Sequence, residues 1–135
     1  MPYTQIDAAF PHFIVDPSSV MNTNGYQVDW ANVPASFQDA AGVKRIPAGY
    51  PMAKTADGLV PRGAADGTLP AAEGLLYSDA SEDVRTDALT GYGFIRGAVV
   101  YAELLPVAGD AAFATIQTEL GPRFAFETYA DSRAA

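Results

Sequence analysis

Short apolar runs alternate with glycine and proline through the middle of the chain. Between residues 46 and 106 each apolar run is brief, and Gly or Pro stands within a few positions of its ends. Each short strand must be followed by a turn. Glycine allows the positive φ that many turns require, and proline fixes φ near the value that others require. The pattern predicts a mainly β fold, built as a small barrel whose strands are soon followed by turns.

Turn residues and alternation predict the individual strands. After the tight-turn pair Asn24-Gly25, apolar and polar side chains alternate over residues 26–30, as in a half-buried strand. Gly97 is expected to mark a bulge or a corner within a later strand. The remaining strands are predicted at 43–46, 51–54, 59–61, 74–77 and 93–100, with the turn Asp57-Gly58 between the second and the third.

One helix is predicted, in the C-terminal half of the chain. Apolar side chains recur at helical spacing over residues 113–120 and therefore share one face. Asp110 is the expected N-cap, and Gly121-Pro122 is the expected end. Alternation over 124–128 then predicts a closing strand. The expected fold class is α+β, mainly β with this single helix, in one domain over residues 26–135.

Residues 1–25 differ from the rest of the chain. Pro2, Pro11 and Pro17 forbid a long helix there. The apolar side chains of the segment include Phe10, Phe13, Ile14 and Val15. Two interpretations stay open: an extended N-terminal arm whose apolar side chains are buried by a partner, or a strand that lies on the protein's own barrel.

Composition narrows the classes of function. The 135 residues suggest one domain, and the net charge of −8 comes from 16 acids against 8 bases. The only adjacent bases are Lys44-Arg45, so a phosphate-binding patch, and with it nucleic-acid binding, is not expected. No apolar stretch could span a bilayer, and the N-terminus lacks a basic signal region. With no cysteine, redox chemistry sets no compartment, and a cytoplasmic origin fits.

Candidate catalytic groups do not form a recognisable set. His12 is the only histidine, and no Gly-x-Ser-x-Gly elbow accompanies it. Glu73 and Glu103, with Asp83, are the carboxylates that an unfamiliar barrel enzyme would need to bring together, but nothing in the sequence shows that they meet. We therefore expect neither an enzyme nor a bound cofactor.

The acidic segment 79–83 has the alternate spacing of a calcium loop. Its sixth position is Val84 where an EF-hand needs glycine, and its twelfth is Thr90 where it needs glutamate. A solvated acidic loop is the better interpretation, so no metal site is predicted.

Five phrases follow one another in order along the middle of the chain. They are Ile46-Pro47-Ala48-Gly49, Gly58-Leu59-Val60-Pro61, Glu73-Gly74-Leu75-Leu76, Gly97-Ala98-Val99 and Leu104-Leu105-Pro106. With this order and spacing the chain resembles the head decoration proteins of tailed bacteriophages, of the lambda type. Each phrase alone is ordinary turn chemistry, and the termini carry no matching pattern.

The resemblance implies a structural protein of the virion. A β-tulip-like domain would sit as a homotrimer at three-fold sites on the outer surface of an expanded icosahedral capsid, bound to the major capsid protein and stabilising the shell. Residues 1–25 would add a strand to a capsid edge, with Phe10, Phe13, Ile14 and Val15 filling pockets.

The aromatic side chains have two possible uses. Packing in the core or at an oligomer or capsid interface is the expected use, and Tyr26, Trp30, Tyr50 and Tyr92 are the candidates for the interface. The alternative is a sugar-binding face, which would make the protein a carbohydrate-binding or host-adhesion module of the virion surface.

Overall fold

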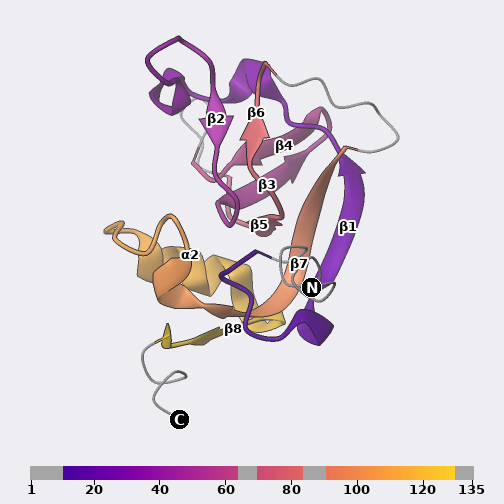
Figure 1. Ribbon diagram of the computed structural model, residues 1–135, viewed down its shortest axis with the longest axis vertical. Helices are drawn as coiled ribbons and strands as arrows, with labels where there is room; N and C mark the ends of the chain where they lie inside the picture. The colour runs from indigo at the N-terminus through magenta and orange to yellow at the C-terminus, as the bar shows by residue number, and fades with distance from the viewer. Residues whose placement is uncertain (1–10, 64–69, 84–90, 130–135) are drawn as a thin grey trace, which may run out of the picture.

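The computed structural model in Figure 1 describes residues 11–63, 70–83 and 91–129. The strands are β1 (Met21–Tyr26), β2 (Arg45–Ile46), β3 (Pro51–Thr55), β4 (Gly58–Pro61), β5 (Gly74–Leu76), β6 (Ala80–Ser81), β7 (Tyr92–Tyr101) and β8 (Phe124–Glu127). The α-helix is α2 (Phe113–Leu120), and the 3-10 turns are η1 (Pro17–Ser19), η2 (Trp30–Asn32), η3 (Ala35–Phe37), η4 (Ala102–Leu104) and η5 (Gly121–Arg123).

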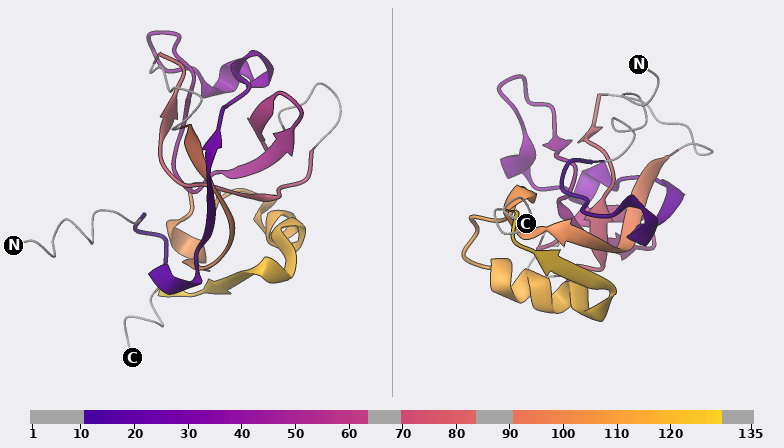
Figure 2. Two further views of the ribbon diagram at one scale, coloured as in Figure 1. Left: turned by 90° about the vertical axis from the view of Figure 1, so that its right-hand side faces the viewer. Right: turned by 60° about the horizontal axis from the view of Figure 1, so that its bottom comes forward.

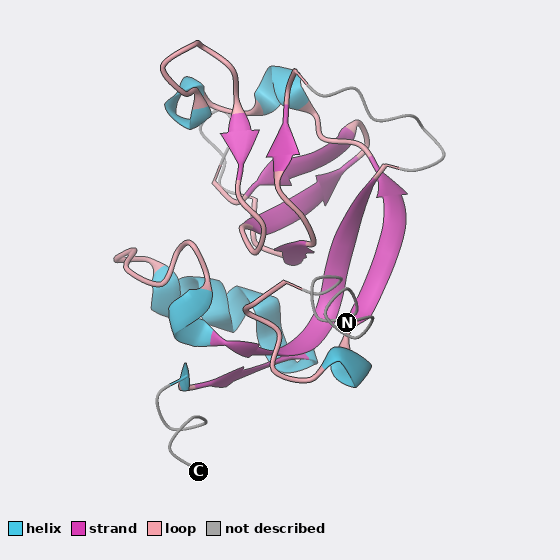
Figure 3. Ribbon diagram, viewed as in Figure 1, coloured by secondary structure: helices cyan, strands magenta, loops and turns pink. Residues whose placement is uncertain are grey.

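The expected fold class is confirmed: the chain is mainly β, with a helix in its C-terminal half (Figure 3). The main sheet has the order β1-β7-β5-β3-β4, and β8 pairs with β7 in parallel. The strands β2 and β6 form a separate antiparallel ribbon. In Figure 1 this ribbon lies at the top, α2 and β8 lie at the bottom, and β7 and β1 connect the two regions.

Strand β7 pairs along both of its edges. Its first half lies between β1 and β5, since Ile95 pairs with both Asn22 and Leu75. Its second half pairs with β8 on one edge, and Val100 forms a bridge to Ile14 on the other. Figure 2 shows the resulting arrangement, in which β1 runs along the molecule in the left-hand view while α2 and β8 lie at its base.

The chain just after β1 connects the two ends of the main sheet. The Leu59 amide on β4 donates to the Gln27 carbonyl at 2.8 Å, and the Asp29 amide donates to the Leu59 carbonyl at 2.9 Å. Because residues 27–29 continue directly from β1, the path β1-β7-β5-β3-β4 returns to its own start. This ring is compatible with the predicted small barrel, with a single bridge at its closing seam.

Two hydrophobic cores lie on opposite faces of the central strands. Leu75 and Ile95 belong to the core that also contains α2, whereas their neighbours Leu76 and Phe94 belong to the core inside the ring. All four side chains are almost fully buried. Alternate residues of a strand point to opposite faces, so β5 and β7 supply both cores at once.

A partly buried ion pair holds α2 against the rest of the domain. The Arg62 guanidinium donates from Nε and Nη2 to the two Glu119 carboxylate oxygens, at 2.9 and 2.8 Å. The Ala72 amide donates to the same carboxylate at 2.8 Å. The hydrogen bonds from Arg62, above all, hold the pKa of Glu119 below its usual range. One carboxylate thus connects α2 to the segments that follow β4 and precede β5.

Most of the predicted strands and the helix are present. The hairpin β3–β4, the strands β5, β7 and β8, and the helix α2 lie where the patterns placed them. The predicted bulge is also present, because the pairing of β1 with β7 skips one residue of β7 next to Gly97. The N-cap of α2 is Ala112, and Asp110 instead accepts the Ala112 amide at 2.9 Å in the preceding turn.

The prediction at Asn24-Gly25 is wrong. This pair makes no hairpin turn but lies inside β1, where one extra residue between Thr23 and Tyr26 forms a second bulge opposite β7. Gly25 has φ of +95°, and a bulge uses that conformation as readily as a turn does. The strand predicted at 26–30 is replaced by the bridge at Val28 and by η2.

We predict that Gly74→Ala destabilises the protein by about 1–3 kcal/mol or more. A Cβ atom at this position would lie 2.3 Å from the Ile95 carbonyl oxygen and 2.8 Å from the Phe94 ring, so β5 would be forced away from β7. Chemical denaturation measures the change. Gly109→Ala is the control, because nothing lies within 4 Å of its Cβ position, and it should change stability by less than about 1 kcal/mol. Equal effects of the two substitutions would contradict this account.

We also predict that Glu119→Gln lowers stability at neutral pH by about 1–3 kcal/mol, because the Arg62 side chain, only 16% exposed, loses its counter-charge. The pKa of Glu119 is lower in the folded than in the unfolded chain. The contribution of Glu119 to stability is therefore present at pH values above its unfolded pKa of about 4.3, and it is lost as the pH falls through its folded pKa. Denaturation at a series of pH values measures the free energy of unfolding. Below about pH 4.3 this free energy should fall less in the variant than in the wild type. Parallel curves would contradict the assignment.

Candidate functional site

The residues predicted to form a partner-binding arm are located first. Phe10 lies outside the described residues. Phe13 is 0% exposed and Ile14 is 8% exposed, and both belong to the core that contains α2. The Val15 amide donates to the Val99 carbonyl at 2.9 Å, and the Tyr101 amide donates to the Phe13 carbonyl at 2.8 Å.

These contacts correct the predicted boundary of the arm. Phe13 and Ile14 already fill the protein's own core, because the backbone of residues 13–15 pairs with the second half of β7. Of the two interpretations left open by the sequence, the strand on the protein's own sheet therefore holds for this segment. An arm reaching a partner could comprise only residues before Pro11.

The predicted interface aromatics pack mainly against the ring core. Tyr92 is 8% exposed, and its hydroxyl has no hydrogen-bond partner among the described residues. Tyr26 is half-buried, with its ring edge-on to Phe94 at 5.4 Å, and the Lys54 ammonium lies 5.5 Å from its centroid. Trp30 is also half-buried beside the same core. A buried Tyr92 cannot contact a partner, and these rings do not gather into one exposed platform.

Tyr50 connects the two cores. It is half-buried, it packs against both clusters, and its ring meets Phe37 edge-on at 5.2 Å. Burial, with a smaller contribution from the charge of Asp110, raises the pKa of the Tyr50 hydroxyl. Because Tyr50 packs between the two cores, it is a packing residue in the described structure.

The candidate carboxylates are held by different parts of the backbone. Glu73 accepts the Lys54 amide on β3 at 3.1 Å, and Glu103 accepts the Tyr129 amide after β8. Asp79 accepts the Ala48 amide at 2.7 Å. Each carboxylate thus connects segments distant in sequence, as a structural bond does. Within residues 11–63, 70–83 and 91–129, no cluster of three metal-binding side chains occurs.

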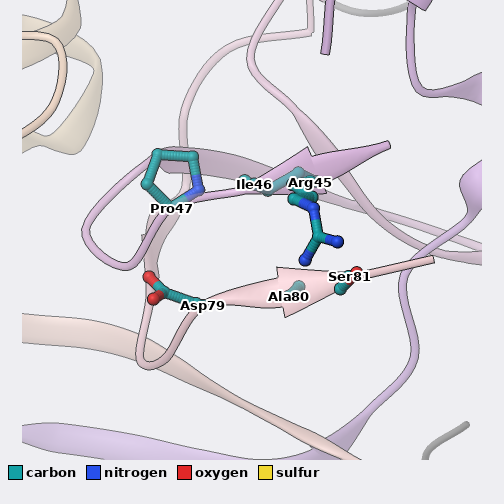
Figure 4. A pocket seen from close by; sticks show the side chains of 6 residues that line it. All are labelled: Arg45, Ile46, Pro47, Asp79, Ala80 and Ser81. Carbon is teal, nitrogen blue, oxygen red and sulfur yellow. The ribbon is translucent and has the colours of Figure 1, made fainter. Parts of the chain in front are cut away.

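A pocket of about 430 Å³ lies over the ribbon of β2 and β6. Its lining is Arg45, Ile46, Pro47, Asp79, Ala80 and Ser81. The pairs Arg45–Ser81 and Ile46–Ala80 face each other across the ribbon. Ile46 and Ala80 are buried in the ring core, so the floor of the pocket is fixed. Figure 4 shows Pro47 and Asp79 at one end and Arg45 and Ser81 at the other.

The charges of this pocket largely satisfy one another. Arg45 donates to Asp39 at 2.6 Å and lies 3.8 Å from Asp83, and the Ser81 hydroxyl donates to Asp83. The hydrogen bond from Arg45, above all, lowers the pKa of Asp39. The arrangement can hold a small polar group, but it offers no base beside an activated nucleophile. The pocket is therefore a surface hollow beside paired charges.

Two features of the sequence point in part to this pocket. Lys44-Arg45 stood out as the only adjacent bases, and 79–83 stood out as an acidic loop. Their meeting depends on the pairing of β2 with β6, two strands of two residues each. Arg45 on β2 pairs with Ser81 on β6, which lies 36 positions later in the chain. Strands this short leave no alternation from which pairing could be predicted.

Comparison with known proteins adds no relative: no model of a protein family matches the chain, and no curated protein matches it. Among the described residues, every helix is too short or too polar to cross a bilayer.

We predict that Phe13→Ala destabilises the isolated protein by about 3–5 kcal/mol, as expected for a large aromatic side chain removed from a core. Thermal or chemical denaturation of the protein alone measures this loss. His12→Ala is the matched control, because His12 is exposed and should change stability by no more than about 0.5 kcal/mol. A Phe13→Ala variant as stable as the wild type would place Phe13 outside the core and restore the longer arm.

Proposed function

We propose that this protein decorates the outside of an expanded icosahedral phage capsid and stabilises the shell by binding the major capsid protein. The proposal assigns it no reaction. It attributes the effect to binding, since a protein that binds only the mature shell stabilises that state by mass action.

The observation that carries the proposal is the meeting of the resembling phrases in space. Gly49 ends the first phrase with φ of +85°, and a Cβ atom there would lie 2.9 Å from the Phe13 ring and 3.2 Å from Pro106 of the last phrase. The Gly49 amide donates to the carbonyl of Leu76, in the third phrase, at 2.8 Å. Three of the five phrases therefore meet at one junction, although Gly49 and Pro106 are 57 positions apart in the chain. Chance turn motifs need not do so, which supports the resemblance.

The electrostatics agree with an outward-facing position. A net charge of −8 repels the packaged genome and favours solubility when the protein is free. The described carboxylates Glu73, Asp79, Glu103 and Glu119 are used to hold the fold, as described above. A rigid domain of this kind is suited to bridging neighbouring subunits of a shell.

A trimer on three-fold sites would strengthen modest contacts. Each copy bound to its neighbours raises the effective concentration of the others, and such linkage can increase overall affinity by roughly 10²–10⁴. The attachment segment that this proposal needs is shorter than the sequence suggested, because residues 13–26 are part of the domain itself.

We predict saturable binding to undecorated expanded capsids and a higher shell-rupture temperature after binding, measured by cosedimentation and by thermal release of DNA. Deleting residues 1–10 should abolish attachment while leaving the denaturation midpoint of the free protein unchanged. The control is deletion of residues 131–135, which should retain attachment. Failure of the full-length protein to bind its own shell, or an unchanged rupture temperature on a saturated shell, would overturn the proposal.

A further inference from the structure

The bulge between β1 and β7 gives the outer face of the sheet an unusual composition. Met21 pairs with Gly97 but the next residue of β1 pairs with Ile95, so Arg96 is the extra residue. Ile95 and Ala98 both point into the core that contains α2, although three positions separate them. Arg96 and Gly97 must therefore both lie on the opposite face, where the side chain of Arg96 is exposed.

Met21 lies beside this bulge. It is 60% exposed, and it is the only large hydrophobic side chain exposed to this degree among the described residues. A Cβ atom on Gly97 would lie 3.2 Å from the Met21 sulfur, 3.4 Å from Arg123 Cβ and 2.9 Å from the Arg123 carbonyl oxygen. Because Gly97 has no side chain, Met21 and Arg123 approach each other over its buried backbone. We call these residues, with Arg96, the bulge surface.

The bulge surface is positive in an otherwise acidic protein. Arg96 is exposed and has no hydrogen bond, ion pair or ring contact with any described residue. Arg123 is exposed and donates to the Glu73 carbonyl at 3.1 Å, a bond that leaves its charge uncompensated. By contrast, Arg45 and Arg62 each pair with carboxylates. The nearest acid on β8, Glu127, lies four positions beyond Arg123 at the other end of the strand.

We propose that the bulge surface docks a carboxylate-bearing, extended segment of a partner protein. The two guanidinium groups would receive carboxylates through charge-assisted hydrogen bonds, and an apolar side chain of the segment would cover Met21 above Gly97. Methionine and arginine are enriched in protein interfaces, and arginine is frequent among the residues that dominate binding energy. Charge complementarity decides the occupant: a cationic or neutral segment gains nothing from the two arginines.

The proposal does not depend on the capsid function. Binding to shells without binding of acidic segments would refute the bulge surface alone. Binding of acidic segments by a protein that ignores its shell would refute the capsid function alone.

The experiment uses the methionine methyl groups of the full chain as reporters. Protein labelled with ¹³C at these methyls is titrated with a short peptide in which glutamates flank a single leucine, and with the same peptide carrying glutamine in place of glutamate. Met21 reports on the bulge surface, and Met52, which is 0% exposed, is the internal control. The Met21 resonance is assigned with Met21→Leu.

We expect the Met21 methyl to shift saturably with the glutamate peptide, while Met52 stays unchanged and the glutamine peptide has a clearly smaller effect. Arg96→Glu should weaken binding of the glutamate peptide roughly fivefold or more, because an exposed charge pair is lost and the new carboxylate repels those of the peptide. Lys54→Glu is the matched control, because it changes the net charge equally at an exposed position on β3 and should leave the affinity within about twofold.

Three results would overturn the proposal. One is a Met21 methyl that does not respond to the glutamate peptide. Another is equal weakening by Arg96→Glu and Lys54→Glu, which would reduce the effect to net charge. The third is a Met21 shift that depends on protein concentration alone, which would identify a second copy of this chain as the occupant.

Discussion

The double use of β7 is the constraint on which the rest of the structure depends. Its residues alternate between two cores, so that Phe94 fills the ring and Ile95 fills the core beside α2. Both edges of the strand are hydrogen-bonded, and the sequence on either side must supply partners for them. Because each core includes one face of the same strand, neither core can form fully without β7.

Local patterns were sufficient for elements whose signals lie within a few residues. The hairpin β3–β4, the helix α2 and the strand β8 were predicted because alternation, helical spacing and turn residues mark them directly. The turn predicted at Asn24-Gly25 was wrong for a physical reason. The positive φ of Gly25 suits a bulge as well as a turn, and only the pairing with β7 distinguishes the two. Likewise, the sequence is compatible with Phe13 in an extended arm or in the core, and only its pairing with β7 decides between them.

The candidate surfaces were harder to predict than the fold. Tyr92 is aromatic and lies at the start of a strand, but its burial depends on residues more than ten positions away. Arg96 becomes an isolated exposed cation only because β1 skips it, and Met21 becomes its neighbour only through that register. Side-chain exposure in a sheet is thus set by pairing between distant segments. A single sequence records the residues of such a surface without recording that they meet.

The last third of β7 also has a consequence for how the domain resists force. The segment around Ile14 pairs with one edge of it in the antiparallel direction, and the strand β8 pairs with the other edge in parallel. The Tyr101 amide donates to the Phe13 carbonyl and Tyr101 pairs with Glu127, so both flanking segments have their outer ends at Tyr101. Tension applied to either outer end along the strand axis would load the backbone hydrogen bonds of that segment to β7 together in shear. Strands loaded in shear separate only when their hydrogen bonds break together. Strands that are peeled apart from one end lose their hydrogen bonds one at a time.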